Sequence, residues 1–175
     1  MLRRSLCLVA FAAIVTPAWA ADPVVNSAAL RPMPAPTTDA FLLRTAAANL
    51  FDLESSQLAL DKSRSSAVRA FADRIVTDHD KVDAAFDKAV EEAGVEAPAD
   101  EMEPPQRLAV RDLKTKEATA FDEQYVLAQY TNHVETVEMY RTYAASGDNP
   151  RLQKFARDVL PLLRDQLAQV KKLRK

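Results

Sequence analysis

The stretch Ser66–Glu92, SAVRAFADRIVTDHDKVDAAFDKAVEE, repeats apolar residues at the three-and-four spacing of one helix face. The repeating residues are Val68, Phe71, Ala72, Ile75, Val82, Phe86 and Ala89, and the pattern continues to Ala93. His79 stands in the middle of this stripe, where the spacing would place another apolar residue, and Asp78 precedes it. The stretch therefore predicts a helix that packs into a core and carries a titratable ring on its buried face.

Turn and capping residues divide the rest of the chain into similar units. The predicted helices cover residues 38–62, 68–93, 104–116, 120–145 and 150–173. Ser65 is expected to cap the second helix, Gly94 to end it, and Thr119 with Asp122 to form a capping box for the fourth. The chain has only two glycines and no visible strand alternation. Because most connections are short, we predict an all-α, antiparallel four-helix bundle with one extra short helix between its second and third long helices.

Apolar stripes indicate which face each of the other long helices buries. The first helix has Leu42, Ala46, Leu50, Leu53, Gln57 and Leu60. The helix over residues 120–145 has Val126, Tyr130, His133, Val137, Tyr140 and Ala144, and the last has Leu152, Ala156, Val159, Leu163, Gln166 and Val170. His133 and Gln166 therefore occupy core positions, as His79 does.

These polar residues lie near the middle of their helices, so an antiparallel bundle brings them to a similar height. We expect one polar layer of His79, His133 and Gln166, with Glu54 or Gln57 facing in from the first helix. The favoured interpretation is a hydrogen-bonded layer, because buried polar groups need partners. One alternative is a divalent metal or metalloid site formed by His79, His133, Glu54 and Gln166, and another is two unrelated histidines. Neither histidine follows a glutamate by three residues, so the paired Glu-x-x-His pattern of di-iron bundles is absent.

The first residues of the chain indicate export. Residues 1–20 combine Arg3 and Arg4, a short apolar run and the sequence Ala18-Trp19-Ala20, which together predict a secretory signal peptide cleaved near Ala20. Residues 21–37 are proline-rich and predict a disordered linker, which leaves residues 38–175 as the helical domain. The single cysteine, Cys7, lies inside the signal. We therefore expect a periplasmic or secreted protein without a disulfide.

The distribution of charge and the absence of known motifs limit the partners and activities that we expect. Acidic and basic residues are mixed along the chain without a basic stripe, so we expect no nucleic-acid partner. No second long apolar run exists, so membrane contact is expected to be peripheral at most. No catalytic triad or phosphate-binding loop is visible, and we assign no catalytic or cofactor-binding residue. The chain is expected to be non-catalytic.

Several segments taken in order resemble the bacterial family called domain of unknown function 4142 (DUF4142). They are Asn49–Glu54, Val68–Ala72, Ile75–His79, Phe121–Tyr125 and Leu160–Arg164. The resemblance covers residues 39–173 and implies a ferritin-like bundle in the cell envelope, since members are often described as exported or outer-membrane proteins. The family's last-helix motif often ends in histidine, where this chain has Gln166.

The functional expectation follows from these observations together. We expect an exported envelope bundle of unassigned activity, with a binding or stress-related role, whose partner is an unknown envelope protein or a second copy of the chain. The alternative is a metal- or metalloid-binding or redox protein that uses the mid-bundle histidines.

Overall fold

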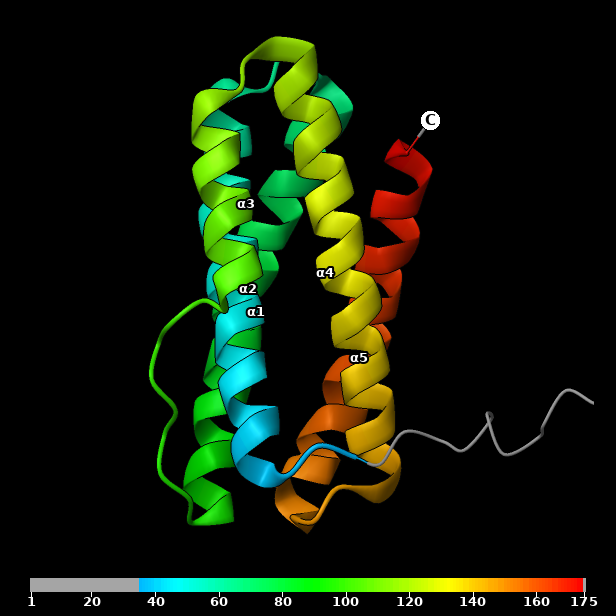
Figure 1. Cartoon of the computed structure of the whole chain (residues 1–175). Coiled ribbons are helices and arrows are strands. Elements are labelled where there is room, and N and C mark those ends of the chain that lie inside the picture. Colours follow the sequence, from blue (N-terminus) through cyan, green and yellow to red (C-terminus); the bar gives the residue numbers. More distant parts are fainter. Residues whose placement is uncertain (1–34, 175) are drawn as a thin grey trace, which may run out of the picture. The chain divides into compact units, whose positions relative to one another are not determined.

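The computed structural model describes residues 35–174, which form five helices and no strand. The helices are α1 (Thr38–Lys62), α2 (Ser66–Ala93), α3 (Pro104–Thr115), α4 (Ala118–Ser146) and α5 (Pro150–Leu173) (Figure 1). The all-α prediction is confirmed, and the short helix lies where it was expected. The predicted signal peptide (residues 1–20) and residues 21–34 of the predicted linker lie outside the described part. None of the helices in residues 35–174 is long and apolar enough to span a bilayer.

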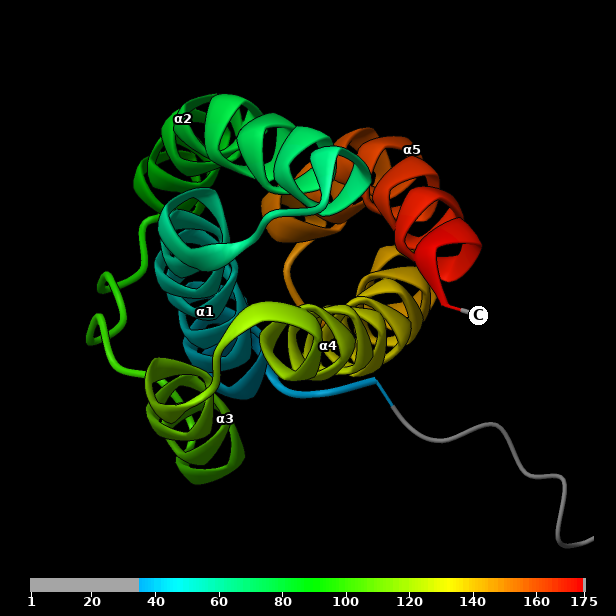
Figure 2. The same ribbon diagram turned by 90° about the horizontal axis from the view of Figure 1, so that it is seen from above.

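The four long helices form a ring, and α3 lies outside it. Helix α1 contacts α2 and α4, and α5 also contacts α2 and α4, whereas α3 packs on α1 and α4 (Figure 2). Cross-helix pairs give the directions: the hydroxyl oxygens of Thr38 and Tyr143 lie 2.7 Å apart near one end of α1, and Ser56 bonds Tyr125 towards the other. Helices α1 and α4 are therefore antiparallel.

Local signals explain most helix ends. The Ser65 hydroxyl accepts a bond from the Val68 amide, and Gly94 ends α2 with φ of 66°, in the left-handed region where glycine is favoured. Thr37 caps α1 by accepting a bond from the Ala40 amide. One expectation needs correction. Helix α4 begins at Ala118 after Glu117, so the predicted capping box at Thr119 is wrong.

The core has two apolar ends separated by polar residues. One cluster contains Phe41, Tyr143 and Phe155, with the rings of Phe41 and Tyr143 stacked at 4.0 Å. The other contains Phe71 and Tyr125, whose ring centroids are 6.3 Å apart. Along α2, α4 and α5 the buried polar residues fall between the members of these two clusters, and on α1 Ser55 and Ser56 do so. The fold thus places a polar layer about midway along the lengths of the four long helices.

The stripe predicted for α1 is partly wrong. Leu50 and Leu53 are only half-buried, and Gln57 is exposed. The buried residues of α1 are Phe41, Leu42, Thr45, Ala46, Ala47, Ala48, Phe51, Ser55, Ser56 and Ala59. Leu50 instead packs beside Met102 and Val110, in the cluster that joins α1 to α3. Helix α1 therefore contributes apolar residues to more than one cluster, with Phe41 in one and Phe51 in the other.

Candidate functional site

The most deeply buried titratable ring in the polar layer belongs to His133 on α4. Only 1 % of the residue is exposed, and Nδ1 lies 2.9 Å from the backbone carbonyl of Gln129, one turn earlier. A carbonyl can only accept, so Nδ1 carries a hydrogen and donates it. The other ring nitrogen, Nε2, has no hydrogen-bond partner and lies 3.9 Å from Oδ2 of Asp52 on α1. The ring is thus fixed by its helix and turned towards a carboxylate.

Asp52 is held by a chain of two side-chain amides. The side-chain amide of Asn132 donates to its Oδ1 at 2.9 Å, and Gln106 of α3 donates to the Asn132 oxygen at 3.0 Å. Burial raises the pKa of Asp52, whereas the nearby His133 and the hydrogen bond from Asn132 oppose that rise. A chain of amides therefore connects the outer helix α3 to the carboxylate facing His133.

A second polar group joins α2 to α5. Asp78 is 9 % exposed, and Gln166 donates to its Oδ2 at 3.4 Å. Arg74 also donates to Oδ2 through Nε at 3.3 Å, and its Nη2 forms an ion pair with Asp165 at 2.7 Å. Gln166 therefore lies in the interior, as expected, but its amide nitrogen is bonded to Asp78.

His79 does not occupy the centre of the buried face that the sequence suggested. Its side chain is 13 % exposed, and Nε2 lies 2.8 Å from Oδ2 of Asp83, one turn later. Asn49 of α1 donates to the other oxygen of Asp83 at 3.1 Å. Both His79 and Asp83 line a cleft of about 440 Å³ that also borders Asp100. Adjacent helix residues are separated by ~100° around the axis, and Asp78 takes the inward position.

The four residues predicted to share a site are therefore divided among three places. His133 faces Asp52, Gln166 bonds Asp78, and His79 pairs with Asp83. Glu54, with 41 % of its side chain exposed, lies 4.0 Å from Lys114 of α3 and is outside the layer. Gln57, the other expected α1 member, is exposed.

The sequence pattern did not single out Asp52 or predict the role of Asp78. A signal for Asp52 was present, because it lies seven residues from both Thr45 and Ala59, on the small-residue face that α1 buries. Within residues 35–174, no three His, Cys, Asp or Glu side chains are arranged to hold a metal ion. Asp52 and His133 supply two such groups, and the Oε1 atom of buried Gln129 also lacks a partner.

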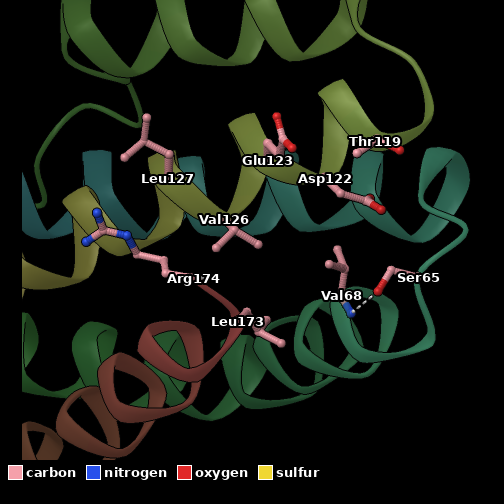
Figure 3. A pocket seen from close by; sticks show the side chains of 9 residues that line it. All are labelled: Ser65, Val68, Thr119, Asp122, Glu123, Val126, Leu127, Leu173 and Arg174. Carbon is pink, nitrogen blue, oxygen red and sulfur yellow. Dashed lines mark hydrogen bonds between the residues drawn. The ribbon is translucent and has the colours of Figure 1, made fainter.

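A separate cavity of about 440 Å³ lies near the start of α2 and the end of α5 (Figure 3). Val68, Val126 and Leu173 give it apolar walls, and Ser65 and Asp122 add polar groups. One carboxylate oxygen of Asp122 is buried without a partner. None of the four predicted site residues lines this cavity.

The fold and its interior define an all-helical protein whose four long helices enclose a carboxylate–imidazole layer. Residues 24–173 match the family described as Domain of unknown function (DUF4142), and the chain belongs to that family. The resemblance inferred from the sequence motifs is thereby confirmed. No curated protein matches the chain.

Two solved structures share the fold. One is "CopM in the Cu(II)-bound form", with 15 % identity, a TM-score of 0.65, and coverage of 79 % of this chain and 95 % of that one. The other is a DUF305 fragment from Deinococcus radiodurans, with 16 % identity, a TM-score of 0.67, and coverage of 80 % and 97 %. Identities this low establish similarity of fold alone.

Proposed function

We propose that this protein is an exported, non-catalytic binding protein of the cell envelope, built on a ferritin-like antiparallel four-helix bundle. The supporting observation is that its interior carboxylates are held by amides from other helices. Asn132 holds Asp52, and Gln166 holds Asp78. Such bonds fix which helices pair and at what register, because breaking one leaves a buried charge without its donor. The bundle then serves as a rigid scaffold for an envelope protein or a second copy of the chain.

Export is tested by expressing the full chain in a bacterial host and separating periplasm from cytoplasm. We expect a periplasmic product that begins at Ala21, detected by intact-mass measurement. A product that retains residues 1–20 in the cytoplasm would contradict the proposal.

The scaffold role is tested separately with Asn132→Ala, which should lower the free energy of unfolding by about 1–3 kcal/mol through loss of the Asp52 bond.

A second candidate function is binding of a divalent metal ion in the layer. The observation in its favour is the buried Nε2 of His133, which has no partner and faces Asp52. Imidazole and carboxylate are common ligands of divalent transition metals, and one protein of similar fold has been solved with Cu(II) bound. In this function His133 and Asp52 would hold the ion as cargo. Gln166 donates its amide nitrogen to Asp78 of α2 and so belongs to the other polar group.

Elemental analysis separates the two candidates. The purified protein is incubated with copper or zinc salts, passed through a desalting column and measured for metal per chain. The scaffold role predicts that His133→Gln leaves the metal content unchanged. Metal binding predicts about one ion per chain in the parent protein and its loss in that variant. Glu54→Gln is the matched control, because Glu54 lies outside the layer beside Lys114.

A further inference from the structure

We infer that the cavity bordered by the start of α2, the start of α4 and the end of α5 binds a small protonated alkylamine. The ammonium group contacts the carboxylate of Asp122, and the alkyl chain lies against the apolar walls. The cavity, drawn in Figure 3, has a volume of about 440 Å³, which is within the range of about 300–1,000 Å³ found for small-molecule sites. It is separate from the polar layer, so the inference goes beyond both candidate functions.

The cavity lies where α5 stops short of the starts of α2 and α4. Helix α5 has 24 residues, whereas α4 has 29 and α2 has 28. Residues 147–149 join the end of α4 directly to the start of α5, so the difference in length appears at the opposite end. Figure 1 shows α5 ending below the start of α4. The first turns of α2 and α4 are therefore left without a helix between them.

The walls of the cavity are apolar side chains from three helices. Val68 of α2 and Val126 of α4 are 5 % and 6 % exposed, and Leu173 of α5 is half-buried. Each methylene moved from water onto such walls should strengthen binding by about threefold to fourfold. An unbranched alkyl chain therefore matches this part of the lining.

Asp122 supplies the charge that selects an ammonium group. One of its carboxylate oxygens is buried and has no hydrogen-bond partner. A carboxylate that is cut off from water on one side, and receives no donor there, attracts a cation more strongly than a fully hydrated one does. Figure 3 shows this side chain extending towards Ser65 and Val68, whereas the neighbouring Glu123 extends away from them.

Arg174 also lines the cavity, but its guanidinium is held elsewhere. Its Cζ lies 3.9 Å from the ring centroid of Tyr130. Tyr130 follows Asp122 by eight residues, which is about 12 Å along α4. Charges that far apart are largely screened at physiological salt, where the Debye length is about 8 Å. The charge of Asp122 is thus available to a ligand.

The helix starts at this end could favour an anion instead, because their first amides lack helical partners. The Ser65 hydroxyl already accepts from one such amide of α2, that of Val68, at 3.4 Å. Asp122 places a fixed negative charge beside the start of α4, where it would repel a second anion. The lining therefore favours a cation.

The test titrates the purified protein with hexylammonium at pH 7 and follows the methyl resonances of Val68, Val126 and Leu173 by nuclear magnetic resonance. We expect saturable shifts of these methyl groups. Butylammonium should bind about 10–15-fold more weakly, because it buries two fewer methylenes. Hexanol has the same chain without the charge and should bind at least about tenfold more weakly than hexylammonium.

The substitution Asp122→Asn should weaken hexylammonium binding at least about tenfold and leave hexanol binding unchanged. Glu123→Gln is the matched control, since it removes the adjacent, exposed carboxylate and should change the affinity by less than about twofold. Leu173→Ala removes part of the apolar wall and should weaken both ligands by about threefold or more. Circular dichroism establishes that each variant is folded.

Three outcomes would overturn the inference. Equal affinities for hexylammonium and hexanol would refute the role of Asp122, and tighter binding of hexanoate would show that the helix starts select an anion. Binding that leaves the three methyl-bearing residues unshifted, or no saturation below about 10 mM, would refute the site. A lysine side chain carries the same ammonium, but its peptide groups would meet apolar walls, so Nα-acetyl-lysine amide should bind at least about tenfold more weakly than hexylammonium. Tighter binding of that probe would overturn the assignment of a free amine.

Discussion

The turn between α4 and α5 is tied to the start of α1 by a single carboxylate, and its removal should make the protein measurably less stable. Asp148 accepts bonds through Oδ1 from the Thr38 hydroxyl at 2.6 Å and the Tyr143 hydroxyl at 3.0 Å. Its Oδ2 accepts from the Thr38 amide at 3.3 Å. These bonds lower the pKa of Asp148, led by the Thr38 hydroxyl. The substitution Asp148→Asn removes this charge and keeps the size of the side chain.

The expected magnitude is modest because the site is open to water. Bonds to a charged group contribute about 1.5–3 kcal/mol when shielded, and solvent screening reduces exposed interactions to about 0–1 kcal/mol. Three bonds to one partly screened carboxylate should together contribute about 1–2 kcal/mol. Asparagine keeps one acceptor oxygen, so Asp148→Asn should lose about 1 kcal/mol near pH 7.

The pH dependence gives the sharper test. The folded-state pKa of Asp148 is lowered from 3.8, so its stabilisation is present above that value and is lost as the pH falls through the folded-state pKa. Urea unfolding followed by circular dichroism should therefore show a gap between parent and Asp148→Asn at pH 7 that closes towards pH 2.5. Asp61→Asn, an exposed change on α1, is the control. A gap of equal size at both pH values would refute the role of the charge, and no gap at either would refute the bonds.

Three further substitutions probe packing and backbone geometry through the free energy of unfolding in urea. Ser56→Ala leaves the buried Tyr125 hydroxyl without its 2.9 Å partner and should cost about 1–3 kcal/mol, whereas the double variant with Tyr125→Phe should cost less than the sum of its single changes. Leu152→Ala, at a fully buried position, should cost about 2–5 kcal/mol, whereas Leu108→Ala, at a position that is 53 % exposed, should stay within about 0.5 kcal/mol. Gly94→Ala should cost about 1 kcal/mol because of the positive φ alone, since an added Cβ would meet nothing within 4 Å.

The helices were largely predictable because their signals are local. The stripe assigned to α5 from the sequence coincides with buried positions throughout, and Ser65 and Asn149 cap their helices through side-chain bonds. Each of these signals needs only a few neighbouring residues to act. Helix α5 also packs against α2 and α4 with a single apolar face, so its pattern has one interpretation.

Helix α1 shows where local signals stop being sufficient. It contacts α2, α4 and α3, and its leucines at positions 50 and 53 are only half-buried. A helix with apolar residues on several sides has no single stripe, so the sequence pointed to Glu54 instead of Asp52. Only the tertiary position of α3 decides between those two carboxylates.

The position of Asp52 also explains why the two halves of the polar layer differ in their hydrogen bonding. Asp52 and His133 face each other between α1 and α4, whereas Asp78 and Gln166 face each other between α2 and α5. In the second pair, Asp78 accepts hydrogen bonds from the Gln166 amide and from Arg74, so its carboxylate has a cation beside it. The first pair has an amide donor on Asp52 but an unpartnered nitrogen on His133. Nε2 of His133 and Oε1 of Gln129 are buried without a partner, so this is the half of the layer in which a bound ion would supply one. Gln166 stabilises the other half through its bond to Asp78.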